Sequence, residues 1–597
     1  MKNLITSLLL LIFTISLNAQ TDSRLKGIDK ELEKILATTN AAGFSVAVVE
    51  KDRIIYSKGF GYRDIENKKK ADENTLFAIG SCTKAFTNTV LGILANDDKV
   101  DFDKSPRSYI PELNFYNDEM NNQITIKDLM SHRTGLPRHD VAWYFFPTDS
   151  KMKLLKRIEY QEPSAGIREV WQYNNFMYLT LGVLGEKITG KTWEQNVTDL
   201  IFKPLQMNRS NTTLAALKKD NNSAKPYEVK DDKIKLVDYY DISGMGPAGS
   251  IHSSANEMGN WLIALINDGK FQGEEIIPMS YLKESISSKM IIHGGLPGKE
   301  RPDIHFATYG YGWMLASYKG HYRVEHGGNI NGFTASTCFF PSDSIGIVVL
   351  ANQNGSAANY MVRNTIMDRL LKVKADDWVK IFEEEKAKQK EAEAMEEEKA
   401  AETKTAGPKV HPFEDIVGSY TNPGYGTLDI LQERDSLFVQ LKRESIWLEH
   451  KQYDIFTPHL IEHGKVDPEG FMGLDFNFSS ANDGTINSVA MKLEASLDPI
   501  IFKKELKTIE VAADALTEYV GDYELMGTIL KVYIKGEDQL IFFVEGQPPY
   551  TLKATEKDLF AIADLDGFKV QFHRDANGKI EALSSVQPNG TFRAKRK

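Results

Sequence analysis

Apolar positions in the first part of the chain follow two different periods. Between residues 24 and 40 they recur every three or four residues, which predicts a helix. Residues 43–49 and 53–57 then read as two strands joined by a charged turn. Strand-like runs return much later, at 312–318, 322–325, 333–340 and 345–350, before a helical run over 357–371. Because strands lie at both ends of this region and helices between them, we predict one sheet assembled from the two ends, an α+β fold with a helical insertion.

The pattern changes twice in the rest of the chain. Residues 383–402 are rich in Glu, Lys and Ala and lack an apolar face, which predicts a solvated helical spacer rather than a membrane-surface helix. From Val410 onward short alternating strands dominate, and residues 417–420 recur as 520–523, an offset of 103. We therefore predict two small β-barrel-like domains after the α+β part.

These shifts divide the 597 residues into five segments. The predicted boundaries are 1–19 for a cleaved signal peptide, 21–372 for the α+β domain, 373–407 for a charged linker, and 408–505 and 506–597 for the two β domains. Met1-Lys2-Asn3, a short apolar run and a small residue at position 19 have the order of an export signal. The run is shorter than a spanning helix needs, so we predict a periplasmic or secreted protein with no stable membrane anchor.

Charge and cysteine content narrow the function classes. The formal net charge of −11 argues against a nucleic-acid partner. The two cysteines, Cys82 and Cys338, are too few for a disulfide framework, and we predict two separate buried thiols. No group of His, Asp or Glu shows metal-ligand spacing, so neither a metal nor another cofactor is expected.

The stretch with the clearest catalytic chemistry is Gly80-Ser81-Cys82-Thr83-Lys84, where a loop turns into an apolar helix. A Ser and a Lys three residues apart share one face of the first turn, and a helix start supplies unpaired N–H groups. Those are the parts that a serine nucleophile needs: an amine that accepts its proton and donors for an oxyanion. The spacing itself is common, since Ser23–Lys26, Ser150–Lys153 and Ser280–Lys283 match it too.

Two later stretches supply the missing groups. Tyr173 and Asn175 stand in a loop before an apolar helix, and together they offer a phenol and an amide. His326, Gly327 and Gly328 follow a strand, where glycines let a substrate backbone approach closely.

Ser81-x-x-Lys84, Tyr173-x-Asn175 and His326-x-Gly328, in that order, resemble the serine penicillin-recognising enzymes. That superfamily includes class C β-lactamases, D-alanyl-D-alanine carboxypeptidases, D-aminopeptidases and related esterases. The resemblance spans residues 27–371 and implies an antiparallel sheet flanked by helices plus a helical subdomain.

The resemblance also implies a role for each motif residue. Ser81 would be the acylated nucleophile, with Lys84 and Tyr173 sharing proton transfer. Asn175 would hydrogen-bond the substrate, and His326 and Gly328 would belong to the strand that binds the substrate. The oxyanion hole would be the backbone N–H groups of Ser81 and Asn329. Whether Lys84 or Tyr173 is the general base stays open.

One departure from the family pattern shapes the functional prediction. Penicillin-hydrolysing and carboxypeptidase members usually carry Lys-Thr-Gly where this chain has His326-Gly327-Gly328. A histidine is only partly charged near neutral pH, and Gly327 offers no hydroxyl. His-x-Gly instead resembles the D-aminopeptidases, some of which carry C-terminal lipocalin-like domains.

We therefore predict a serine hydrolase acting on D-residue-containing peptides or amides. An esterase or weak β-lactamase is the alternative within enzymes. A non-catalytic penicillin-binding sensor, acylated but not turning over, is the alternative outside them. The expected partner is a small peptide, amide or ester substrate.

Overall fold

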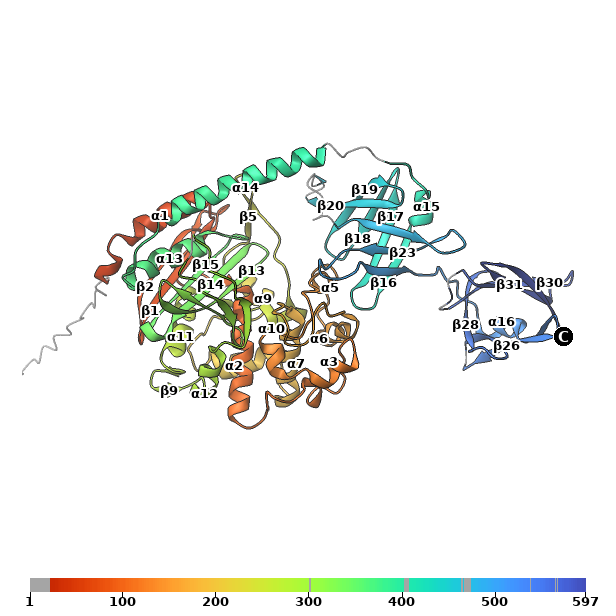
Figure 1. Ribbon diagram of the computed structural model, residues 1–597, viewed down its shortest axis with the longest axis horizontal. Coiled ribbons are helices and arrows are strands. Elements are labelled where there is room, and N and C mark those ends of the chain that lie inside the picture. The colour runs from red at the N-terminus through yellow and green to blue at the C-terminus, as the bar shows by residue number, and fades with distance from the viewer. Residues whose placement is uncertain are drawn as a thin grey trace, which may run out of the picture. The chain divides into compact units, whose positions relative to one another are not determined.

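The computed structural model describes residues 22–299, 302–401, 407–462, 465–466, 474–536, 538–563, 565 and 567–597. The predicted signal peptide lies outside them. The chain folds into two compact units (Figure 1). The first unit holds residues up to Arg138, Thr148–Glu159 and Ala165–Glu397. The second unit holds His139–Pro147, Tyr160–Ser164 and the chain from Glu398. Among the described residues, no helix combines the length and apolar character that crossing a lipid bilayer requires.

A nine-stranded antiparallel sheet forms the centre of the first unit, in the order β10-β11-β12-β13-β14-β15-β1-β2-β3. The strands from the end of the region are β10 (Met290–His293), β11 (Ala307–Tyr309), β12 (Met314–Tyr318), β13 (His321–Ile330), β14 (Phe333–Phe340) and β15 (Ile345–Ala351). The strands from its start are β1 (Gly43–Glu50), β2 (Arg53–Asp64) and β3 (Lys69–Lys70). β1 pairs with β15, with Val46 opposite Val349. The two ends of the region therefore meet in one sheet, and the predicted α+β fold is confirmed.

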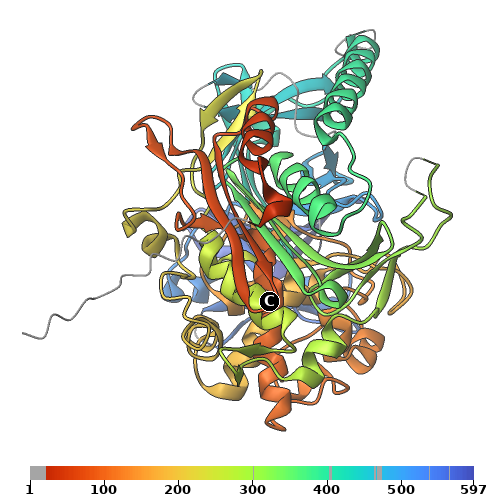
Figure 2. The ribbon, with the colours of Figure 1, turned by 90° about the vertical axis from the view of Figure 1, so that its left-hand side faces the viewer.

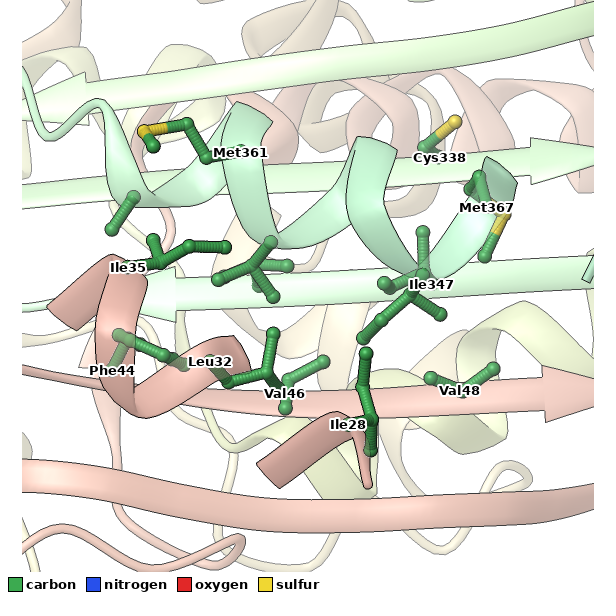
Figure 3. Packing of buried hydrophobic residues seen from close by; sticks show 14 of the residues in the cluster. Ile28, Leu32, Ile35, Phe44, Val46, Val48, Cys338, Ile347, Met361 and Met367 are labelled. Atoms are coloured by element: carbon green, nitrogen blue, oxygen red, sulfur yellow. The ribbon is translucent and has the colours of Figure 1, made fainter. Parts of the chain in front are cut away.

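Helices cover both faces of this sheet (Figure 2). On one face α1 (Ile28–Thr38) and α13 (Ala358–Leu370) bury a cluster that includes Val46 and Ile347, as Figure 3 shows. On the other face α11 (Ala255–Ile266) packs against β1 and β15. The contact there is close, because a Cβ on Gly346 would lie 2.9 Å from Ile266. Burial on both faces explains why β15 is apolar at every position rather than alternating.

The helical subdomain between β3 and β10 is built on α2 (Thr83–Asn96) and α7 (Asn175–Thr189), which pack against each other. The Asn174 side chain caps α7 by accepting the Phe176 N–H, and Gly190 ends it in the left-handed conformation that favours glycine. The short helix α10 (Gly246–Gly249) packs against both α2 and α7.

The second unit contains two closed β-sheets, as the repeat predicts. The first joins β16 (Gly418–Asn422), β17 (Gly426–Glu433), β18 (Ser436–Gln440), β19 (Ser445–Gln452), β20 (Ile455–Glu462), β22 (Phe476–Ser480), β23 (Ile486–Met491) and β24 (Ile500–Lys504), with β21 (Lys465–Val466) added to β20. The pairing of β19 with β20 closes this sheet into a barrel. The second barrel joins β25 (Gly521–Leu525), β26 (Thr528–Lys535), β27 (Gln539–Val544), β28 (Tyr550–Glu556), β29 (Leu559–Ile562), β30 (Lys569–Arg574), β31 (Ile580–Gln587) and β32 (Gly590–Arg596).

Some local predictions need correction and one is confirmed. The strand expected from residue 312 begins at Met314, because Gly312 adopts a turn conformation with φ +78°. The strand expected to end before His326 continues to Ile330, since β14 pairs with it along that whole length. Cys82 and Cys338 are both free and buried, so the prediction of two separate thiols is confirmed.

Candidate active site

Ser81 lies in a single 3-10 turn, Gly80–Cys82 (η2), that leads directly into α2. The helix start predicted from the sequence is therefore present. Gly80 has φ +49°, which favours glycine, and a Cβ there would lie 2.9 Å from the backbone nitrogen of Asn329. The turn that presents Ser81 is thus pressed against β13.

Lys84 is fully buried one turn into α2, and its Nζ is surrounded by oxygen atoms. It lies 3.0 Å from Ser81 Oγ, 2.8 Å from Asn175 Oδ1 and 2.8 Å from the Ala248 carbonyl oxygen. The Ala248 carbonyl belongs to α10, which is tied to α2 because Thr87 Oγ1 donates to the Pro247 carbonyl at 2.7 Å. Three separate elements therefore converge on one amine.

The three partners of Lys84 define what the amine can do in each protonation state. A lysine ammonium has three N–H donors, one for each of the three oxygens. A neutral amine has two N–H donors, which Asn175 Oδ1 and the Ala248 carbonyl would accept. Its lone pair would then face the Ser81 hydroxyl at hydrogen-bonding distance. These contacts thus hold the amine within hydrogen-bonding distance of Ser81 Oγ in both protonation states.

Tyr173 lies beside this pair, and charged and aromatic groups surround its ring. Lys84 Nζ is 4.8 Å and the Arg138 guanidinium carbon 5.0 Å from the ring centroid. The His132 ring is 4.3 Å from it, centroid to centroid. Tyr173 and Asn175, two residues apart in the sequence, therefore approach Lys84 from two sides. The structure brings Ser81, Lys84, Tyr173 and Asn175 together as the sequence predicted.

His326 is buried, and both of its ring nitrogens are engaged by the protein. Nδ1 lies 2.6 Å from the Gly327 carbonyl oxygen, and Nε2 lies 3.0 Å from the Tyr309 hydroxyl. Because a carbonyl only accepts, Nδ1 carries the proton and Nε2 accepts from Tyr309. Burial, and next the charge of Lys84, lower the pKa of His326 to about 4. The imidazole is therefore neutral near pH 7, and it does not provide the cation that Lys-Thr-Gly members have here.

Gly328 and Asn329 run past the nucleophile on β13. A Cβ on Gly328 would lie 1.9 Å from the Ile79 carbonyl oxygen and 3.0 Å from the Ser81 nitrogen, so only glycine fits. The Asn329 side chain accepts from Thr334 Oγ1 and from the Gly355 N–H, each at 3.0 Å. This packing places the backbone of β13 next to the Ser81 turn, where the oxyanion hole is expected.

Several residues that touch this group belong to none of the three motifs. His132 is fully buried, and its Nδ1 accepts the Asn174 N–H at 3.2 Å. Its ring packs against Tyr173 and Tyr309. His132 also has φ +55°, a left-handed conformation that costs energy for a non-glycine residue. In the sequence, His132 is visible only as part of the stop signal after the helix at 126–130. The Ala248 carbonyl gives no signal, because every residue type has a backbone oxygen.

A buried carboxylate fixes the loops that carry these aromatic residues. Asp128 is fully buried in α4 (Ile126–Met130) and pairs with Arg133 and Arg168, each at 2.6 Å. Burial opposes its ionisation, but Arg168 and the other donors keep the pKa of Asp128 below its usual value. The loops after α4 and before α7 are therefore tied to one anion. Removing either arginine would leave the buried carboxylate less compensated, which should destabilise these loops.

The neutral state of His326 gives a prediction for stability against pH. The unfolded imidazole takes up a proton near pH 6.5, whereas the folded one does so only near pH 4. The contribution of His326 to stability is therefore complete above pH 6.5 and is lost as the pH falls toward 4. We expect the free energy of unfolding of the wild type to fall by about 3 kcal/mol more than that of His326→Gln between pH 7 and pH 4.

Urea unfolding of both proteins at several pH values measures this difference. His293→Gln, which alters an exposed histidine outside the site, is the matched control. Parallel pH profiles for the wild type and His326→Gln would contradict a neutral, buried imidazole.

Comparisons with known proteins find relatives for both parts of the chain. The Beta-lactamase family profile matches residues 28–372, and a domain of unknown function, DUF3471, matches residues 402–507. The chain is 28% identical over 521 residues to the unguisins hydrolase of Aspergillus campestris, which covers 80% of this chain and 92% of that protein. It is 26% identical over 360 residues to Protein flp of Staphylococcus aureus, covering 58% of this chain and 66% of that protein. Among solved structures, an octameric penicillin-binding protein homologue from Pyrococcus abyssi has the same fold, with a TM-score of 0.53, 18% identity, and coverage of 80% of this chain and 100% of its own.

Proposed function

This chain belongs to the beta-lactamase family of serine hydrolases, and we propose on that premise that it is an exported hydrolase acting through an acyl-enzyme on Ser81. The single observation that carries the proposal is the 3.0 Å contact between Lys84 Nζ and Ser81 Oγ at the start of α2. A buried amine held by two further acceptors and aimed at a hydroxyl is the arrangement of an activated nucleophile. Export rests on the sequence of residues 1–19 alone.

The proposed reaction begins with proton transfer from Ser81 to Lys84. In the neutral state the amine lone pair accepts the hydroxyl proton as Oγ attacks the substrate carbonyl carbon. The carbonyl oxygen gains the negative charge, and the backbone N–H groups of Ser81 and Asn329 stabilise it. Lys84 is our candidate base, and its nitrogen is in hydrogen-bonding distance of Oγ.

The second half of acylation needs a proton for the leaving group. We assign this transfer to Tyr173, the phenol beside Lys84, whose ring centroid is 4.8 Å from the Lys84 Nζ. The bond between the carbonyl carbon and the leaving nitrogen breaks, the amine leaves protonated, and the acyl group remains on Ser81. Water then hydrolyses the ester, releases the acid and restores the hydroxyl.

The chemistry at position 326 supports the substrate class. A Lys at this place attracts the carboxylate of penicillins and of carboxypeptidase substrates, whereas the neutral His326 does not. We therefore favour uncharged amides or peptides with D-residues over β-lactams and free C-terminal carboxylates. The relative in Aspergillus campestris is also named as a hydrolase. An esterase is the second candidate, because the same site would accept an ester.

Mass spectrometry with a substrate panel tests the function. We expect D-aminoacyl amides to be turned over, and a short quench to trap an acyl group on the peptide that contains Ser81. Nitrocefin is expected to react much more slowly. Faster turnover of p-nitrophenyl esters would favour the esterase, and an adduct that persists for hours with every compound would favour the sensor.

A further inference from the structure

Two short segments of the second unit come from the middle of the chain. His139–Pro147 and Tyr160–Ser164 lie inside the span that the Beta-lactamase profile matches, yet they pack with the first barrel. Both segments come from the loop region before α7. The first barrel therefore holds pieces of chain that the sequence assigns to another domain.

The apolar half of this packing joins the inserted segment to residues of the first barrel. Phe146 stacks on Phe502 with ring centroids 6.0 Å apart. A cavity of about 30 Å³ adjoins these rings, and apolar residues line it: Val141, Phe145, Phe146, Leu428, Leu441, Ile446, Leu474, Phe476, Met491, Leu493 and Phe502. Side chains of the segment and of the barrel strands therefore share one apolar site.

The polar half of the packing centres on His139, which is fully buried. Its Nε2 faces the Glu162 carbonyl oxygen at 3.0 Å, so Nε2 carries the proton and Nδ1 accepts from the Tyr425 hydroxyl at 2.8 Å. Its backbone N–H donates to the Glu494 carboxylate at 2.5 Å. Each hydrogen-bonding group of the imidazole is thus satisfied by the second unit. His139 also has φ +49°, a conformation that such contacts must hold in place.

The hairpin between β16 and β17 is shaped for these segments. A Cβ on Gly424 would lie 2.9 Å from Tyr160 Cβ, and one on Gly426 would lie 2.7 Å from the Phe146 ring. Between these glycines Tyr425 is buried. The equivalent hairpin of the second barrel is one residue shorter and has Met526, which is 96% exposed. The two repeats therefore share a fold but differ where the first one holds the segments.

We propose that the first barrel is a receptor for residues 139–147 and that it thereby positions the active site. His139 directly follows Arg138, whose guanidinium carbon is 5.0 Å from the Tyr173 ring centroid. Holding His139 restrains the backbone of Arg138 and keeps its cation over the catalytic ring. Tyr425 and Phe146 are positioning residues, and the apolar side chains of the first barrel bind this segment. The kinetic part of this inference rests on the proposed function, whereas the binding of the segment does not.

Two substitutions test the receptor. Tyr425→Phe removes the hydroxyl that donates to His139 Nδ1, and Phe146→Ala removes the ring that stacks on Phe502. The matched control is Tyr420→Phe, which removes a buried hydroxyl of the same barrel that donates to the Ile416 carbonyl at 2.6 Å. The rate of amide hydrogen exchange in residues 139–147 of the full chain directly measures how firmly the barrel holds this segment.

We expect exchange in residues 139–147 to speed up about fivefold in Tyr425→Phe, the effect of one lost hydrogen bond, and considerably more in Phe146→Ala. We expect kcat to fall about tenfold in Phe146→Ala, with a smaller change in KM, because Arg138 lies over Tyr173, to which the proposed reaction gives a proton transfer. Tyr420→Phe should leave both readouts at the wild-type level.

The outcomes separate the two claims. Unchanged exchange in both variants would overturn the receptor. Faster exchange with unchanged kcat and KM would overturn the positioning of the active site. If the wild type turns over no substrate in the panel, labelling of Ser81 by a fluorophosphonate probe replaces kcat, and the exchange experiment still tests the receptor alone.

Discussion

Replacing Ser81 with alanine is expected to lower kcat by about 10⁴-fold or more for every substrate. The variant keeps the turn, the helix start and the contacts of Lys84 with Asn175 and Ala248, but it lacks the atom that forms the acyl bond. Initial rates on the best amide of the panel measure the loss of kcat. Mass spectrometry should find no acyl adduct on the peptide that contains residue 81.

The chain contains its own control for this substitution. Ser280 stands three residues before a lysine, as Ser81 does, but it is exposed in α12 (Met279–Ser285). Ser280→Ala should keep wild-type activity. If Ser81→Ala retained a substantial fraction of kcat while remaining folded, the acyl-enzyme mechanism would be wrong.

Replacing Lys84 with methionine should lower kcat/KM by about 10² to 10⁴-fold, the usual range for a general base. Methionine fills a similar volume but accepts no proton from Ser81, and it removes the hydrogen bonds from Lys84 to Asn175 Oδ1 and to the Ala248 carbonyl. Loss of those two buried hydrogen bonds should also lower the stability by roughly 1–3 kcal/mol each. The rate of Ser81 acylation and the thermal midpoint are measured together.

Lys283→Met is the matched control, because Lys283 is exposed beside Ser280. It should change neither the rate nor the midpoint. A Lys84→Met variant that acylates at the wild-type rate would transfer the role of base to Tyr173.

Most of the first unit could be predicted from local patterns. The stripe of Ile28, Leu32 and Ile35 identifies α1, because an amphipathic helix must place its apolar residues on one face. The unbroken apolar run of β15 reflects a strand covered on both sides. Boundaries were less accurate: β13 continues past His326 because pairing with β14, a long-range interaction, extends it.

The candidate site, too, could be predicted only in part. Ser81, Lys84, Tyr173 and Asn175 could be identified from motif order, since their side chains carry the chemistry. His132 and the Ala248 carbonyl could not, because one resembles an ordinary core histidine and the other is a backbone atom. The charge state of His326 was also hidden, because it depends on burial and on the nearby Lys84.

Periodicity and motif order, which are properties of the chain, were enough to predict the α+β class, the repeated β domains and the Ser81–Lys84 pair. The contacts of Lys84 with Asn175 and Ala248 and the neutral state of His326 emerge only in the fold, since both follow from burial and from groups far apart in the sequence. The fold has a further consequence for the chain's middle. It also decided that residues 139–147 pack with the first barrel. No local pattern marks that segment, because Tyr425, Glu494 and Phe502, which hold it, follow it by 286 to 356 residues.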